Sequence, residues 1–174
     1  NVGGTRTVLQ LATQTRLKSV HHISTLSILH TGGHDDGRVY AEDTDLDLNG
    51  APFGGYAQSK WVAEKLVMAA GRRGVPVAIY RPGLVAGDSE TGAWNTSDMM
   101  SNLIRACYSA GITPQLSVMV DVVPVNFVSG AIVYLARQPS FHNKIYHLAN
   151  PVRESYHDLI AWIGKSGYVT QNVP

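Results

Sequence analysis

The sequence of 174 residues is poor in net charge, cysteine and long apolar runs, and each shortage excludes a class of protein. Its formal net charge of +1 gives no field that would attract nucleic acid or an anionic membrane. No apolar run reaches the roughly 18 residues that a membrane span needs, and no signal-peptide pattern opens the chain. The single cysteine, Cys107, excludes an internal disulfide framework and is typical of a reducing compartment. We therefore expect a cytoplasmic globular domain, for which a hydrophobic content of 44% supplies a core.

The two ends of the sequence carry no initiator methionine and no terminal signal. The first residues, "NVGGTRTVLQLATQ", already have the pattern of a helix. We therefore expect residues 1–174 to form a single segment of a longer polypeptide.

Apolar periodicity predicts helices and strands that alternate along the chain. The helices are expected at residues 1–14, 55–72, 98–111, 127–138 and 154–167. The strands are expected at residues 18–24, 75–80, 121–126 and 144–150, with a long loop over 30–54 and a break at "RPG" after residue 80. Strands separated by helices indicate an α/β fold with a parallel sheet.

One short stretch, "GGYAQSKWVAEKL", places Tyr56 four residues before Lys60 in the first turns of a predicted helix. This spacing puts both side chains on one face of the helix. A nearby ammonium lowers the pKa of a phenol from about 10, so such a tyrosine can donate a proton to a carbonyl that receives hydride. The spacing also occurs by chance in many helices, so its meaning depends on the surrounding elements.

The elements around this helix favour a catalytic pair. Ser24 and Thr25 follow a predicted strand, and "RPG" follows the next one. Ligands of open α/β sheets gather at the carboxyl ends of strands, where a hydroxyl group could bind a substrate oxygen. Either Ser24 or Thr25 could supply that hydroxyl.

Six stretches that run nearly from end to end resemble an extended short-chain dehydrogenase/reductase. They are "NVGGTRTVLQLA", "ISTLSIL", "YAQSKWVAEKLV", "IYRPGLVAGDSETGAWN", "DVVPVNFVSGAIVYLA" and "YHLANP". More narrowly, "RPGLVAGDSETGAWN" and "DVVPVNFV" resemble the thioester reductase domains of nonribosomal peptide synthetases and carboxylic acid reductases. The resemblance implies a partial Rossmann-type sheet with flanking helices, without the N-terminal cofactor-binding half.

The same resemblance implies an NADPH-dependent oxidoreductase that reduces an acyl or peptidyl thioester on a phosphopantetheinyl carrier protein to an aldehyde or an alcohol. In such an enzyme Thr25 would hold the substrate carbonyl and Tyr56 would donate the proton. Lys60 would bind the nicotinamide ribose and tune Tyr56. The residues beside the nicotinamide would be Pro82, Gly83 and Leu84.

Two departures from the family pattern qualify this expectation. The glycine-rich dinucleotide fingerprint is absent, because "HTGGHDDG" and "GLVAG" have neither its spacing nor its setting. We therefore predict that the isolated chain binds NADPH weakly or not at all and is inactive. We also predict an unpaired sheet edge near residues 18–24, which would favour self-association. The second departure is Asn126, where related sequences commonly carry Asp.

Several alternatives stay open at this stage. The chain could belong to another extended reductase or epimerase acting on a nucleotide sugar or ketone, to a release domain that cyclises without redox chemistry, or to a non-catalytic module. Met99 and Met100 could line an acyl pocket or fill the core. A metal site is not expected, because four candidate ligands lack an accepted ligand spacing. They are His30, His34, Asp35 and Asp36.

Overall fold

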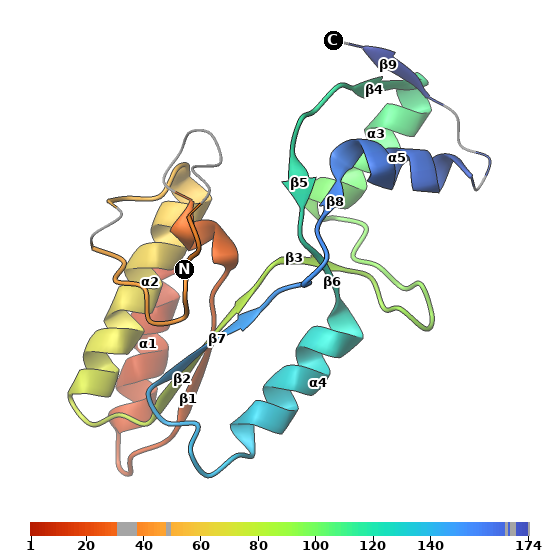
Figure 1. Ribbon diagram of the computed structural model, residues 1–174. Helices are drawn as coiled ribbons and strands as arrows, with labels where there is room; N and C mark the ends of the chain where they lie inside the picture. Colours follow the sequence, from red (N-terminus) through yellow and green to blue (C-terminus); the bar gives the residue numbers. More distant parts are fainter. Residues whose placement is uncertain (31–37, 48–49, 166, 168–169, 174) are drawn as a thin grey trace. The chain divides into compact units, whose positions relative to one another are not determined.

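The structure is a computed structural model that describes residues 1–30, 38–47, 50–165, 167 and 170–173 (Figure 1). The helices are α1 (Val2–Thr13), α2 (Gly55–Arg72), α3 (Met99–Ala110), α4 (Val125–Ala136) and α5 (Tyr156–Gly164), with a 3-10 helix η1 (Leu26–Leu29). The strands are β1 (Val20–Ile23), β2 (Val77–Pro82), β3 (Leu84–Ala86), β4 (Ile112–Pro114), β5 (Met119–Val120), β6 (Val122–Pro124), β7 (Lys144–Leu148), β8 (Glu154–Ser155) and β9 (Gln171–Val173).

These elements form two compact units, and each unit is assembled from two separate stretches of chain. The first unit holds residues 1–83 and 128–148, and the second holds residues 84–127 and 149–174. The chain therefore passes between the units three times, after Gly83, after Phe127 and after Leu148.

The first unit contains a parallel three-stranded sheet in the order β1-β2-β7. The register pairs Val20 with Val77 and Arg81 with His147. This sheet confirms the predicted α/β class with a parallel sheet. Within the residues that the structure describes, β1 lies at one edge of the sheet, as expected for the strand near residues 18–24.

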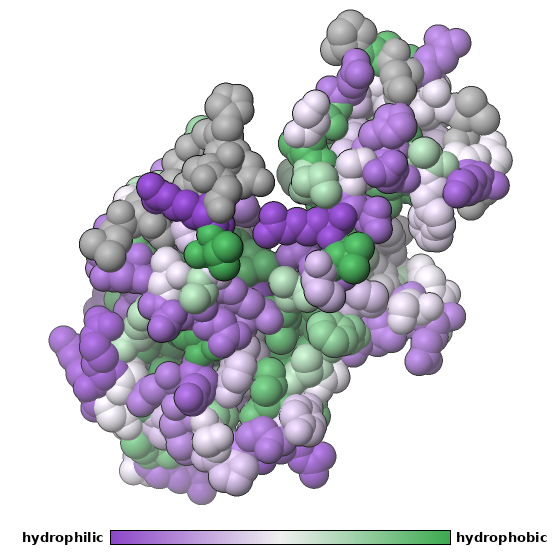
Figure 2. All heavy atoms as spheres, viewed as in Figure 1, coloured by the Kyte–Doolittle hydropathy of each residue, from purple (hydrophilic) through white to green (hydrophobic). Residues whose placement is uncertain are grey.

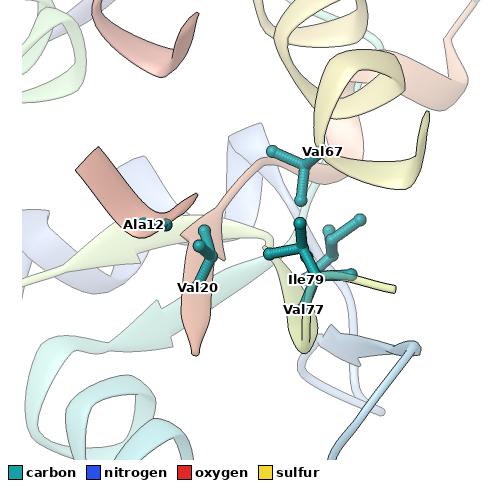
Figure 3. Close-up of a cluster of buried hydrophobic side chains, with 6 residues drawn as sticks. Ala12, Val20, Val67, Val77 and Ile79 are labelled. Carbon is teal, nitrogen blue, oxygen red and sulfur yellow. The ribbon is translucent and has the colours of Figure 1, made fainter. Parts of the chain in front are cut away.

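The core of this unit lies between the sheet and helices α1 and α2 (Figure 3). It joins Ala12 of α1, Val20 of β1, Val67 of α2, and Val77 and Ile79 of β2. Because side chains alternate along a strand, Arg81 shares the face of β2 that Val77 and Ile79 present to α2. A charged side chain thus continues an apolar row at the carboxyl end of the strand.

Helix α2 has the bounds that the sequence predicts, and Gly74 follows it with a left-handed φ of 93°. The apolar spacing of Val62, Leu66, Val67 and Ala70 predicts one buried stripe on this helix, and the prediction is wrong at Val62, which is exposed. The buried residues instead include Glu64 and Gly71. The helix therefore turns a carboxylate and a glycine toward the sheet.

Replacing Gly71 with alanine should destabilise the first unit. An added Cβ would lie 2.7 Å from Val77 Cγ2 and 2.8 Å from Asn143 Oδ1, so the helix would have to move away from the sheet. We expect the free energy of unfolding to fall by about 1–3 kcal/mol in urea denaturation. Gly4→Ala in α1 is the matched control, because no atom lies within 4 Å of its added Cβ. That control should raise the stability, and an equal rise for Gly71→Ala would contradict the prediction.

The second unit is built from short strand pairs and helices α3 and α5. The pairs β3-β6 and β4-β9 are parallel, and β5-β8 is antiparallel. Asp98 caps α3 by accepting a hydrogen bond of 2.6 Å from the Ser101 N–H. Ser155 caps α5 in the same way through the Asp158 N–H. These caps explain why both helices begin within two residues of their predicted starts.

Several large apolar side chains of the first unit are exposed, and Figure 2 shows hydrophobic residues at the surface among hydrophilic ones. They include Val8 and Leu11 of α1 and Val133 and Tyr134 of α4. Exposed apolar clusters commonly mark surfaces that pack against further polypeptide.

In the part of the chain that the structure describes, no helix has the length and apolarity of a membrane span.

Candidate functional site

The first turns of α2 lie against the carboxyl end of β1. Lys60 makes this link, because its Nζ donates a hydrogen bond to the carbonyl oxygen of Ile23, the last residue of β1. Tyr56 lies one turn earlier on the same helix and is 63% exposed. The phenol is therefore open to a ligand, while the ammonium is held at the strand end.

Thr25 lies two residues beyond β1 and caps η1. Its Oγ1 accepts a hydrogen bond from the Ser27 N–H at 3.2 Å and donates one to Ser27 Oγ, also at 3.2 Å. The 3-10 helix packs on α2 through a cluster that includes Trp61 and Met68. Thr25 thus lies where β1 and α2 meet, although it makes no hydrogen bond to Tyr56 among the described residues.

The neighbouring hydroxyl of Ser24 has a different environment. Its backbone N–H donates to the Tyr80 carbonyl at 2.7 Å, which continues the pairing of β1 with β2. Its side-chain oxygen is buried without a hydrogen-bond partner among the described residues. The spacing in the sequence left Ser24 and Thr25 as alternatives, and both residues are buried, with exposed fractions of 3% and 7%.

Burial lowers the pKa of the Lys60 ammonium, and the carboxylate of Glu64 acts in the opposite direction. Burial also lowers the pKa of His22 on β1, with a further lowering by the charge of Lys60. The imidazole of His22 is therefore neutral near pH 7, since the ordinary pKa of histidine is about 6.5. Lys60 is the cation that lies at the end of β1.

The segment of Pro82, Gly83 and Leu84 follows the middle of the sheet. The expected break at "RPG" is wrong, because Arg81 and Pro82 belong to β2 and pair with β7. The Gly83 N–H donates to the Leu148 carbonyl at 3.1 Å, which ends this pairing. Leu84 begins β3 in the second unit. The placement of this segment beside a nicotinamide stays a prediction.

A buried ion pair lies one helical turn beyond Lys60, and it was not predicted from the sequence. Glu64 and Arg81 are both 0% exposed, and Arg81 Nη2 lies 2.7 Å from Glu64 Oε1. Arg81 Nε donates to the same oxygen at 3.1 Å, and Nη1 lies 3.0 Å from His147 Nε2. A charged residue within the apolar run "VAIYRP" and a glutamate four residues after Lys60 were the available signs.

The structure places some of the residues that were considered as metal ligands or as the lining of an acyl pocket. His30 is described and exposed, while His34, Asp35 and Asp36 lie outside the described residues. No cluster that could hold a metal ion occurs among the residues that the structure describes. Met100 is buried and Met99 is exposed. A cavity of about 430 Å³ in the second unit is lined by other residues, chiefly 113–119 and 155–157.

The order of elements is the one expected of an extended short-chain dehydrogenase/reductase: a parallel sheet, a hydroxyl after β1, and a tyrosine and lysine in the first turns of α2. The profile of the family described as male sterility protein matches residues 1–132, and the chain belongs to this family. Relatives of the chain include the reductase domains of nonribosomal peptide synthetases.

Known relatives share most of this chain but extend far beyond it. A linear gramicidin synthase of Brevibacillus parabrevis is 37% identical over 173 residues, which are 99% of this chain and 3% of that protein. Glycine betaine reductase ATRR of Emericella nidulans is 38% identical over 175 residues, which are 98% and 14% of the two chains. The crystal structure of the terminal R domain from the myxalamid PKS-NRPS pathway is 44% identical, with a TM-score of 0.92, over 100% of this chain and 43% of that one.

Proposed function

We propose that the chain is part of an NADPH-dependent reductase that releases a carrier-bound acyl or peptidyl thioester as an aldehyde or an alcohol. The observation that carries this proposal is the link between α2 and β1, in which Lys60 lies at the strand end and Tyr56 is open one turn away. Similarity to the myxalamid R domain supports the thioester as the substrate class.

The residues of this chain would divide the chemistry among them. Thr25 and Tyr56 would donate hydrogen bonds to the thioester oxygen and stabilise the oxyanion that develops there. Tyr56 would also give its proton to the substrate oxygen when an aldehyde is reduced further to an alcohol. Collapse of the oxyanion would break the carbon–sulfur bond and release the aldehyde and the pantetheine thiolate, which takes a proton from water.

The residues at the strand ends fit the nicotinamide end of a dinucleotide. An ammonium has three N–H donors, and among the described residues the Ile23 carbonyl takes one from Lys60, so the other two would be available to ribose hydroxyls. Pro82, Gly83 and Leu84 would lie beside the ring. NADPH, when bound, would supply the hydride.

We further propose that residues 1–174 are one segment of a longer reductase domain. The chain spans less than half of the myxalamid R domain, and the 174 residues contain no glycine-rich fingerprint for the pyrophosphate. The segment alone would bind NADPH weakly and show little activity. Its edge strand β1 would also allow self-association. The whole enzyme would act in the cytoplasm.

Three other functions would use the same fold. An epimerase or ketone reductase would act on a nucleotide sugar or free ketone, and a cyclising domain would release product without NADPH. A non-catalytic module would do neither. The similarity to R domains favours thioester reduction over all three.

A substrate comparison tests the proposal on the full-length protein. We expect NADPH oxidation with an acyl-pantetheine thioester and formation of an aldehyde or alcohol, with slower oxidation of NADH. A nucleotide sugar should give no turnover. Turnover of the sugar alone, or product from the thioester without any nucleotide, would overturn the proposal in favour of the epimerase or the cyclising domain.

A further inference from the structure

A row of polar side chains crosses the sheet beneath the first turns of α2. The register places His22 of β1 beside Ile79, and Arg81 of β2 beside His147 of β7. Alternation along the strands puts the side chains of His22, Arg81 and His147 on the face of the sheet that α2 covers. Lys60 and Glu64 are the residues of α2 near this row. The row therefore lies in the layer that supports Lys60.

Arg81 is fixed from several directions within this row. Its Nε and Nη2 bind Glu64, and its Nη1 lies 3.0 Å from His147 Nε2 and donates to the Glu42 carbonyl at 3.3 Å. The Glu42 carboxylate in turn accepts a hydrogen bond of 2.8 Å from the backbone N–H of His147. Since β2 is the central strand, Arg81 holds the Glu64 carboxylate at a defined point above the sheet.

A buried pair of this kind needs a reason other than stability. Ion pairs removed from water lose much hydration, and apolar residues of similar volume often stabilise a fold at least as well. The complete burial of Glu64 and Arg81 therefore does not follow from the needs of the core. The position of Glu64, one turn after Lys60 on the same face of α2, suggests a role for its charge.

The balance of charge in the row supports that role. Burial lowers the pKa of both His22 and His147, so neither imidazole carries a charge near pH 7. Lys60 and Arg81 then supply two positive charges, and Glu64 is the buried carboxylate between them. Burial lowers the pKa of Lys60, and Glu64 is the charge that opposes this lowering.

We propose that Glu64 is a positioning residue that acts through Lys60: anchored by Arg81, its carboxylate is the counter-charge that lets the Lys60 ammonium stay protonated at the end of β1. The catalytic meaning of this inference rests on the proposed function, because Lys60 would hold the nicotinamide ribose as a cation. The electrostatic part concerns the chain alone and is measured without turnover.

The first test is an NMR titration of the 174-residue chain with carbon-13-labelled lysine, in which the Lys60→Arg variant identifies the Lys60 signal. We expect Glu64→Gln to lower the pKa of Lys60 by about one unit, which is the usual scale of a neighbouring opposite charge. The groups facing Lys60 and Glu64 that titrate or carry charge are His22, Glu42, Arg81 and His147, and all are retained in this variant.

Glu64→Gln leaves Arg81 unpaired and could prevent folding, so a second variant combines Glu64→Met with Arg81→Met. Both charges are then replaced by apolar side chains, and the pKa of Lys60 should again fall. The control is Asp47→Asn, which removes the partner of Lys65 from an exposed pair that also involves α2. A pKa of Lys60 that is unchanged or raised in the double variant would overturn the inference.

The second test is the pH profile of thioester reduction by the full-length protein. A lowered pKa means that Lys60 loses its proton at a lower pH, so the alkaline limb of the profile should move down in both variants by the shift found in the titration. An unmoved limb, with the wild type active, would overturn the catalytic part. A shift in the titration without turnover by any form, including wild type, would uphold the counter-charge and reject the proposed function.

Discussion

Replacing Tyr56 with phenylalanine should lower the rate of thioester reduction by about 10²–10³-fold in the full-length protein, because it removes one of the two hydrogen-bond donors to the developing oxyanion. The side chain of Tyr56 is 63% exposed and does not belong to the buried core, so loss of its hydroxyl should not disturb the packing of the fold. NADPH consumption with an acyl-pantetheine thioester measures the effect, and circular dichroism checks the fold.

The matched control is Tyr134→Phe. Tyr134 lies on α4 and is 67% exposed, so the change removes a phenol of similar exposure from the same unit. We expect this variant to keep the wild-type rate. Equal rates for wild type and Tyr56→Phe would reject Tyr56 as a donor to the substrate oxygen and, with it, the predicted set of Thr25, Tyr56 and Lys60.

The second large effect concerns stability. Arg81→Met should lower the free energy of unfolding by about 3–5 kcal/mol, because it leaves the fully buried Glu64 carboxylate without its partner. This loss is a large part of the roughly 5–15 kcal/mol that stabilises a typical domain. Urea denaturation followed by Trp61 fluorescence reports on the first unit once Trp94 and Trp162, both in the second unit, are replaced by phenylalanine.

Two variants separate the ion pair from its setting. Adding Glu64→Met to Arg81→Met removes both charges, and most of the lost stability should return. Asp47→Asn breaks the exposed pair with Lys65 and should cost less than about 1 kcal/mol. If the double variant is as unstable as Arg81→Met, the two side chains stabilise the fold mainly by their packing and not by neutralising each other's charge.

The elements that the sequence predicts well are those long enough to show a period. Helix α2 has its predicted bounds, and β1 and β7 lie within the predicted strands. The strands β5 and β8 have two residues each, which is too short for an alternating pattern. Pro82 also misled the prediction, because a proline usually ends a strand before it and here is the last residue to pair.

The residues of the candidate site were predicted where they lie close together in the sequence, and they were missed where the interacting residues are far apart along the chain. Tyr56 and Lys60 are visible as a spacing on one helix, and Thr25 as a hydroxyl after a strand. A helical period places apolar residues in the core, and Glu64 was therefore overlooked. Its partner Arg81 is 17 residues away along the chain, and no local pattern connects them.

The threading of the chain through its two units has a practical consequence for anyone who cuts the gene. Neither unit is encoded by one continuous segment of the gene, because each combines two stretches of sequence that are separated by a stretch of the other unit. A truncation after Gly83 would take α1, β1, α2 and β2 but leave out β7, the strand that pairs with β2. Expressing the first unit alone would require residues 1–83 to be joined to 128–148 by a designed linker.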